Sequence, residues 1–230
     1  MSRHRKPHLR CADCRLHRSL CICALLPRLE TRTRLFLVVH QLEATKPTNT
    51  GLLAARCLVN SAVVYRGRDP DGTLAPDAFD PREGRDVEPV MLFPHPEATP
   101  LDVWRGSGKP LVLVVPDATW GQAARARRRG PLRTLPCVSL PPAVVDEARA
   151  SRPDARLRRP TQPDRLATLE AVALALGILE GPAIRDALLH IYRVMADRTL
   201  WTNGRLPTEA VTGGIPAGVQ SHDPLSLARE

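Results

Sequence analysis

The sequence has few aromatic residues: three Phe, three Trp and two Tyr among 230 residues. Proteins that bind single-stranded nucleic acid mainly by stacking bases on rings need more of them, so that class is disfavoured. Lysine is also scarce, with 3 residues against 30 arginines. The net charge is nevertheless +9 at pH 7. Such an excess indicates a polyanionic partner, although codon usage can also enrich arginine.

Long apolar runs are missing as well. No segment approaches the ~18 apolar residues of a membrane span, and the basic N-terminus is not followed by the apolar stretch of a secretory signal. We therefore expect a cytoplasmic protein without a membrane partner, in which cysteines stay reduced.

There is no G-x-G-x-x-G after the first predicted strand and no G-x4-G-K-[ST], which disfavours dinucleotide-binding and P-loop folds.

The positive charge is concentrated in two blocks. Residues 1–34 carry nine basic and two acidic groups, and residues 121–168 carry eleven and four, so each block has a net charge of +7. The rest of the chain has a net charge of −5. Codon usage alone would spread arginine evenly. The blocks therefore predict contacts with phosphate groups, the alternative being two solvated faces.

Four of the six cysteines follow the pattern C-x2-C-x6-C-x-C within thirteen residues: Cys11, Cys14, Cys21 and Cys23. In a reducing compartment, clustered thiols favour metal binding over disulfides. Four thiolates complete the tetrahedral coordination of Zn2+, which predicts a structural zinc site. An iron–sulfur cluster and incidental thiols are the alternatives.

Short apolar runs alternate with helical patterns along the rest of the chain. We expect strands at 35–39, 63–65, 90–93, 111–115 and 137–140, and helices at 49–60, 121–129, 168–180 and from 182 onward. This alternation predicts an α/β fold whose mostly parallel sheet has helices on both faces. We divide the chain into a four-cysteine zinc-binding module at 1–30, an α/β catalytic domain at 31–205 and a flexible C-terminal tail at 206–230.

Two polar clusters follow predicted strands, at residues 40–50 and 117–120. Ligands of parallel sheets bind at the carboxyl ends of the strands, so both clusters are candidate sites. In the first, we expect His40 and Glu43 to bond to substrate or to loop backbone rather than to a metal. In the second, Asp117 either acts on a ligand or caps the helix that follows it. Thr168 is expected to cap the helix that begins there.

The run Asp117-Ala118-Thr119-Trp120, between an apolar strand and a basic helix, resembles the signature of the DTW-domain family. Gln41 stands where the family commonly has Pro, and residues 153–155 stand where it often has an aromatic residue. Other matching pieces occur in the family's order: the cysteine pattern, residues 40–43 leading to 48–50, Leu92-Phe93-Pro94, and Leu157-Arg158-Arg159 followed by 168–171.

The resemblance implies a tRNA-uridine aminocarboxypropyltransferase, related to the SPOUT-type RNA methyltransferases and so with a C-terminal trefoil knot. Such an enzyme transfers the 3-amino-3-carboxypropyl group of S-adenosylmethionine to N3 of a uridine and releases 5′-methylthioadenosine. The alternatives are an S-adenosylmethionine-dependent RNA methyltransferase, a non-catalytic zinc-bearing RNA-binding module, and a zinc-stabilised protein with a small-molecule substrate. The oligomeric state, monomer or homodimer, stays open.

The resemblance also implies site residues. Asp117 is the base or the orienter of the uracil, Thr119 offers a hydroxyl, and Trp120 stacks on a base or anchors the following helix. We expect cofactor contacts on the loops after the late strands and at a cation or helix N-terminus: Thr48, Asn49, Thr50, Leu135, Leu140, Pro141, Arg158, Thr168 and Glu170. We expect tRNA phosphates to contact the arginines of the second block: Arg125, Arg127, Arg128, Arg129, Arg152, Arg156 and Arg159.

Overall fold

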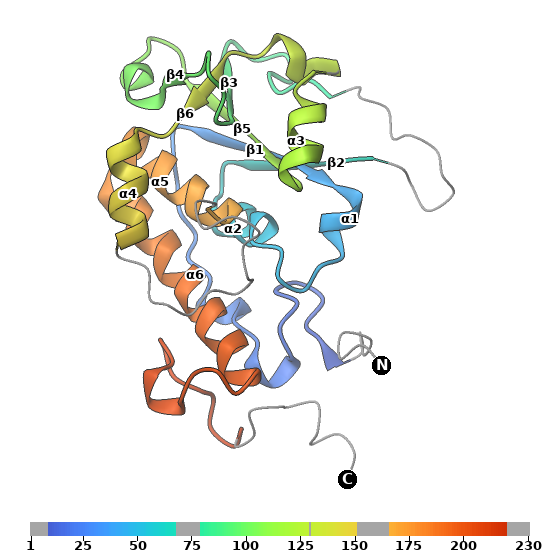
Figure 1. Cartoon of the computed structure of the whole chain (residues 1–230), viewed down its shortest axis with the longest axis vertical. Coiled ribbons are helices and arrows are strands. Elements are labelled where there is room, and N and C mark those ends of the chain that lie inside the picture. The colour runs from blue at the N-terminus through green and yellow to red at the C-terminus, as the bar shows by residue number, and fades with distance from the viewer. Residues whose placement is uncertain (1–8, 68–78, 129, 151–165, 220–230) are drawn as a thin grey trace.

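The computed structural model describes residues 9–67, 79–128, 130–150 and 166–219 (Figure 1). Its strands are β1 (Arg34–His40), β2 (Ser61–Arg66), β3 (Glu88–Leu92), β4 (Thr99–Pro100), β5 (Leu111–Asp117) and β6 (Cys137–Ser139). Its α-helices are α1 (Gln41–Ala44), α2 (Gly51–Cys57), α3 (Trp120–Ala126), α4 (Pro142–Ala150), α5 (Thr168–Glu180) and α6 (Pro182–Thr202). Short 3-10 turns include η2 (Arg18–Leu20), η3 (Cys23–Leu25), η4 (Leu101–Trp104), η5 (Gly130–Thr134) and η6 (Thr208–Ala210).

The strands form one sheet in the order β2-β1-β5-β3-β6-β4, and each described pair of neighbours is parallel. β5 lies in the interior of the sheet, with β1 on one side and β3 on the other. β1 and β5 are apolar along their length because both of their faces are covered. The predicted α/β fold with a mostly parallel sheet is confirmed.

Helices cover both faces of this sheet. Because side chains alternate along a strand, Leu35 and Leu37 of β1 join one core with α2, α5 and α6. Phe36 and Val38 join a second core on the opposite face, with α3 and the residues around η5. Val144 of α4 packs against the first core. The carboxyl ends of β5 and β6 therefore lie between two helical layers.

The helix expected at 49–60 is shorter than its sequence pattern predicts. α2 ends at Cys57 because the backbone becomes extended at Leu58. There the chain bonds to a distant segment: the N–H of Leu29 donates to the carbonyl of Cys57 at 2.8 Å, and the N–H of Val59 donates to the carbonyl of Leu29 at 2.9 Å. A tertiary contact thus replaces the last turn of the predicted helix.

The start of α5 corrects one prediction. The N-cap residue is Ala167, not Thr168, and the carboxylate of Glu170 accepts the Ala167 N–H at 2.8 Å. The expected break between α5 and α6 is confirmed, because Gly181 adopts a φ of +112° and Pro182 begins α6. None of the described helices is both long and apolar enough to cross a membrane.

The cysteine-rich N-terminal residues pack near the C-terminal end of α6 (Figure 1). Leu20 is buried there together with Trp201 and Val211. The indole N–H of Trp201 donates to the Thr208 hydroxyl at 2.9 Å. The first part of the expected flexible tail, residues 206–219, thus contacts both α6 and the cysteine-rich residues.

The trefoil knot that the resemblance implies remains a prediction. The connection between α4 and α5 includes residues 151–165, which lie outside the described part of the chain.

Candidate functional site

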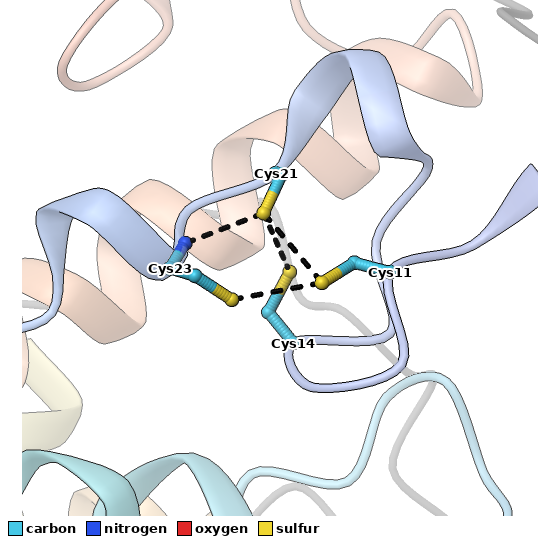
Figure 2. A group of neighbouring side chains, drawn as sticks. All are labelled: Cys11, Cys14, Cys21 and Cys23. Carbon is cyan, nitrogen blue, oxygen red and sulfur yellow. Dashed lines mark hydrogen bonds between the residues drawn. The ribbon is translucent and has the colours of Figure 1, made fainter.

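The four clustered cysteines point toward a common centre (Figure 2). The Sγ–Sγ distance is 3.6 Å for Cys11–Cys23 and for Cys11–Cys21, and 3.8 Å for Cys14–Cys21. All four sulfurs lie within 4.8 Å of one another. Four sulfurs at the usual Zn–S distance of about 2.3 Å form a tetrahedron with edges of about 3.8 Å. The cluster can therefore hold a metal ion, and its geometry fits zinc.

The thiols of this cluster titrate differently from one another. Burial is the main cause that raises the pKa of Cys14 to about 11. Hydrogen bonds with the backbone of Ile22 and Leu16 partly oppose this rise. Burial, followed by the neighbouring cysteines, also raises the pKa of Cys23. Burial tends to raise the pKa of Cys11 too, but hydrogen bonds from its neighbours outweigh it and the net shift is downward. Metal binding must therefore displace protons from Cys14 and Cys23.

A buried arginine from α6 supports the cysteine cluster. Nη1 of Arg198 donates to the carbonyls of Leu20 and Cys21, at 3.2 and 3.1 Å. Burial lowers the pKa of Arg198, while the nearby Cys14 and Cys21 oppose that shift. No local pattern in the sequence indicates this contact, because Arg198 and Cys21 are 177 residues apart.

Asp117 lies at the carboxyl end of β5 and joins three segments of the chain. Its side chain is buried and accepts hydrogen bonds from Asn49 Nδ2 at 2.5 Å and from Thr168 Oγ1 at 2.6 Å. A Cβ atom on Gly51, at the start of α2, would come within 2.7 Å of this carboxylate. The three segments therefore approach so closely that only glycine fits beside Asp117.

The helix after Asp117 is capped by another residue. Thr119 is the N-cap of α3, where its hydroxyl accepts the Gln122 N–H and the Gln122 side chain accepts the Thr119 N–H. This reciprocal pair is a capping box. Thr119 is thus the N-cap of α3, while the carboxylate of Asp117 accepts hydrogen bonds from Asn49 and Thr168.

The loop after β1 is held by its own polar groups. Asn49 also donates to the carbonyl of Glu43 at 3.2 Å and accepts the N–H of Leu52 at 2.9 Å. The Thr50 hydroxyl accepts the N–H of Leu169, at the start of α5, at 3.3 Å. Buried Glu43 forms an ion pair with Lys46. These bonds tie the predicted 48–50 stretch to β5 and α5.

His40 caps the short helix α1. Its Nδ1 accepts the N–H of Leu42 at 3.2 Å, so the expected bond to loop backbone is confirmed. Burial, together with the positive charges of Arg66, Arg125 and Lys46, lowers the pKa of His40 and favours its neutral form. The nearby Glu43 carboxylate opposes this shift in the pKa of His40.

A pocket of about 400 Å3 opens at the carboxyl ends of β3, β5 and β6. Its volume lies in the range of small-molecule sites, and most of its lining is apolar. The rings of Phe93 and Trp120 form part of the wall, with centroids 5.9 Å apart and planes inclined at 45°. α4 and the start of α5 complete it. The lining includes Pro94, Val115, Ala118, Ser139, Leu140, Val145, Asp146, Arg149 and Thr168.

A family model described as the DTW domain matches residues 8–200. The chain belongs to the DTW-domain family. This is the family of tRNA-uridine aminocarboxypropyltransferases. The match covers both the cysteine cluster and the strand ends that carry the Asp117–Trp120 segment, called the DTW segment below. No solved structure matches the chain significantly.

The structure divides the predicted cofactor residues into two groups. Leu140 and Thr168 line the pocket next to the DTW segment, and Pro141 follows Leu140 directly. The rest of the described set lies elsewhere: Thr48, Asn49 and Thr50 in the loop beside Asp117, Leu135 in the core on the α3 face, and Glu170 at the cap of α5. Arg158 falls outside the described residues.

The predicted RNA-binding arginines also differ among themselves. Arg125 and Arg128 are exposed on and just after α3. Arg127 instead turns toward β3 and β6, with Nη2 2.6 Å from His95 Nε2 and Nη1 4.0 Å from Cys137 Sγ. The other four, Arg129, Arg152, Arg156 and Arg159, lie outside the described residues.

Sequence reasoning missed one wall of the pocket. Asp146 and Arg149 of α4 both line it, yet their helix carried no motif and only a weak apolar pattern. The signal that was available is position: only Leu140 and Pro141 separate α4 from β6, and the carboxyl ends of parallel strands carry ligand sites.

Proposed function

We propose that this DTW-domain protein transfers the 3-amino-3-carboxypropyl group of S-adenosylmethionine to N3 of a uridine in tRNA and releases 5′-methylthioadenosine. One observation carries the proposal: the pocket at the strand ends lies directly against the DTW segment, with Ala118 and Trp120 in its wall. The family supplies the tRNA-modifying class of reaction.

The pocket suits S-adenosylmethionine in size and chemistry. A volume of about 400 Å3 can hold an adenosine with a short amino-acid chain. The Phe93–Trp120 pair offers aromatic faces for the adenine or for the incoming uracil. Ser139 and Leu140, at the end of β6, also line the pocket.

The reaction mainly requires alignment. The bond from uridine N3 to the carbon next to the sulfonium forms while the carbon–sulfur bond breaks, and the N3 proton leaves. Because the sulfonium is already an activated leaving group, holding nucleophile and carbon in line supplies much of the rate. Asp117 serves this alignment: its bonds to Asn49 and Thr168 fix the DTW segment against α2 and α5. This environment supports an orienting role more than proton transfer.

Charge supports tRNA as the acceptor. The chain carries a net charge of +9. α3 begins in the DTW segment, and exposed Arg125 lies on this helix while exposed Arg128 lies just after its end. Contacts with phosphates give affinity and position, while base identity must come from the site itself. The four-cysteine cluster at 1–30 supplies a structural zinc module beside the catalytic domain at 31–205. A reducing cytoplasm would keep its thiols available for the metal.

The test is the mass of the modified nucleoside. The protein is incubated with unmodified tRNA and S-adenosylmethionine, and the tRNA is digested to nucleosides for mass spectrometry. We expect aminocarboxypropyluridine together with methylthioadenosine. Reactions without tRNA, without S-adenosylmethionine and with Trp120→Ala serve as controls, and the variant should lose most of the product. A methylated nucleoside with adenosylhomocysteine would instead show a methyltransferase, and an unmodified tRNA that still binds would show an RNA-binding module.

A further inference from the structure

Two charged side chains from α4 line the pocket. Asp146 and Arg149 are three residues apart on the helix, and Nη1 of Arg149 donates to Oδ1 of Asp146 at 3.0 Å. Among the described residues that line the pocket, no other side chain carries a formal charge. The charge in this part of the wall is therefore confined to one acid and one base, side by side.

This pair matches the chemistry of an α-amino acid. Such a group carries a carboxylate and an ammonium on one carbon, so its partner must offer an opposite charge to each. The planar guanidinium of Arg149 can donate parallel hydrogen bonds to a carboxylate, and it can bond to two carboxylates at once. The carboxylate of Asp146 accepts hydrogen bonds from an ammonium group. The apolar and aromatic remainder of the lining suits the adenosine and the sulfur.

The position of the pair also favours ligand binding over a role in folding. The side chain of Arg149 is 36% exposed and that of Asp146 is 68% exposed. Ion pairs this close to solvent add little to stability, so replacing either partner should leave the fold intact. A ligand that closes the pocket would remove water from the pair and strengthen its contacts.

We propose that Arg149 binds the carboxylate and Asp146 the ammonium of the aminocarboxypropyl group, and that the pair thereby directs the carbon to be transferred toward the uridine. The inference rests on the proposed function, because it identifies which end of S-adenosylmethionine α4 holds. It also gives a reason why the aminocarboxypropyl carbon, and not the methyl group, faces the acceptor. Anchoring the amino-acid end fixes the chain on one side of the sulfur.

Calorimetric binding to the full-length protein tests the proposal with three ligands: S-adenosylmethionine, decarboxylated S-adenosylmethionine and methylthioadenosine. We expect Arg149→Gln to lower the affinity for S-adenosylmethionine by about ten- to a hundredfold, because a hydrogen bond to a charged group is lost. The other two ligands lack the carboxylate, so their affinities should change by less than about twofold. Arg149→Lys keeps the positive charge but lacks the planar guanidinium. Its affinity for S-adenosylmethionine should therefore lie between those of the wild type and of Arg149→Gln.

Arg185→Gln is the matched control. Arg185 also pairs with a neighbouring aspartate, Asp186, at 2.8 Å, and its side chain is 38% exposed, but it lies on α6 outside the lining. Its replacement should leave all three affinities unchanged. Equal losses for all three ligands in Arg149→Gln, or no loss at all, would overturn the assignment while leaving the proposed function standing. A wild-type protein that binds no S-adenosylmethionine, with or without tRNA, would overturn both.

Discussion

Asp117 shows how a signature residue can act through its neighbours. Its two carboxylate oxygens accept from Asn49, in the loop after β1, and from Thr168, at the start of α5. The segments that meet at Asp117 are 68 and 51 residues away along the chain. Burial makes each bond costly to lose, because a polar group left unsatisfied in the interior costs about 1–3 kcal/mol. The DTW segment is thus fixed in place by contacts that reach well beyond its own helix and strand.

Gly51→Ala tests this arrangement without removing any polar group. The new Cβ would lie 2.7 Å from the carboxylate of Asp117, which is buried and held by two hydrogen bonds. Because the carboxylate cannot move without breaking a bond, we expect a loss of about 1–3 kcal/mol in the free energy of unfolding. The proposed transferase activity should fall with it. Thermal or urea unfolding and a turnover assay measure the two effects.

Gly121→Ala is the control for this prediction. Gly121 lies in α3, next to the DTW segment, and a Cβ there would meet no atom within 4 Å. Alanine should therefore stabilise the helix by about 0.5–1 kcal/mol, because glycine loses more backbone entropy on folding. Equal stability of the two variants would contradict the tight packing between α2 and β5.

Helix α6 contacts both the N-terminal cysteine-rich residues and the segment that follows the helix. Near its C-terminal end, Arg198 donates hydrogen bonds to the backbone of the cysteine loop, and Trp201 is buried together with Leu20 and Val211. The backbone N–H of Thr212 donates to buried Asp197 at 3.0 Å. The segment after α6 therefore forms part of the support for the cysteine cluster, although its sequence resembles a tail.

A chain that ends at Arg205 tests this role. Removing the rest exposes Trp201 and Leu20 and deletes the burial of Val211, which alone is worth about 1.5–3 kcal/mol. We expect a lower unfolding temperature and faster loss of zinc to a chelator, followed by a coloured zinc indicator. A chain that ends at Val219 keeps these contacts and should behave as the full-length protein does. Identical zinc release from both truncated chains would show that the segment does not support the cluster.

At the scale of the whole molecule, the pocket and a group of positive charges lie at the same edge of the sheet. The carboxyl ends of the parallel strands carry the pocket, and the same edge bears the cations around His40 and the exposed side of α3. The opposite layer, formed by α5 and α6, packs into the larger core. A folded polyanion that delivers a base to the pocket would therefore lie across the α3 side.

Reversing charge on α3 tests this orientation. The double variant Arg125→Glu and Arg128→Glu should weaken tRNA binding about tenfold or more at low salt. The slope of the logarithm of affinity against the logarithm of salt concentration should become shallower by the amount expected for about two lost phosphate contacts. Filter binding over a salt series measures both quantities. Exposed Arg193 on α6 provides a control of equal charge for the single variant Arg125→Glu, and Arg193→Glu should change affinity by less than about twofold. Equal effects of these two single reversals would show that only net charge matters.

Much of the fold and part of the site could be predicted from local pattern. The apolar runs at 35–39 and 111–115 indicated central strands, and the Gly181-Pro182 pair marked a helix boundary, because these signals depend on neighbouring residues alone. The cysteine spacing indicated a metal cluster for the same reason. The predictions for the cap of α5 and for the end of α2 were wrong. The Thr168 hydroxyl bonds to Asp117, and the backbone on either side of Leu58 bonds to Leu29, both distant in the sequence.

The sequence by itself thus determined the type of elements, the metal-binding chemistry and the family signature, since each is encoded within a short window. Only the tertiary structure decided what Asp117 bonds to, which of the predicted cofactor residues line a pocket, and that α4 supplies its charged wall. The physical reason is the parallel sheet. Its crossovers bring strand ends together from positions far apart in the chain, so their side chains meet in ways that no local pattern records.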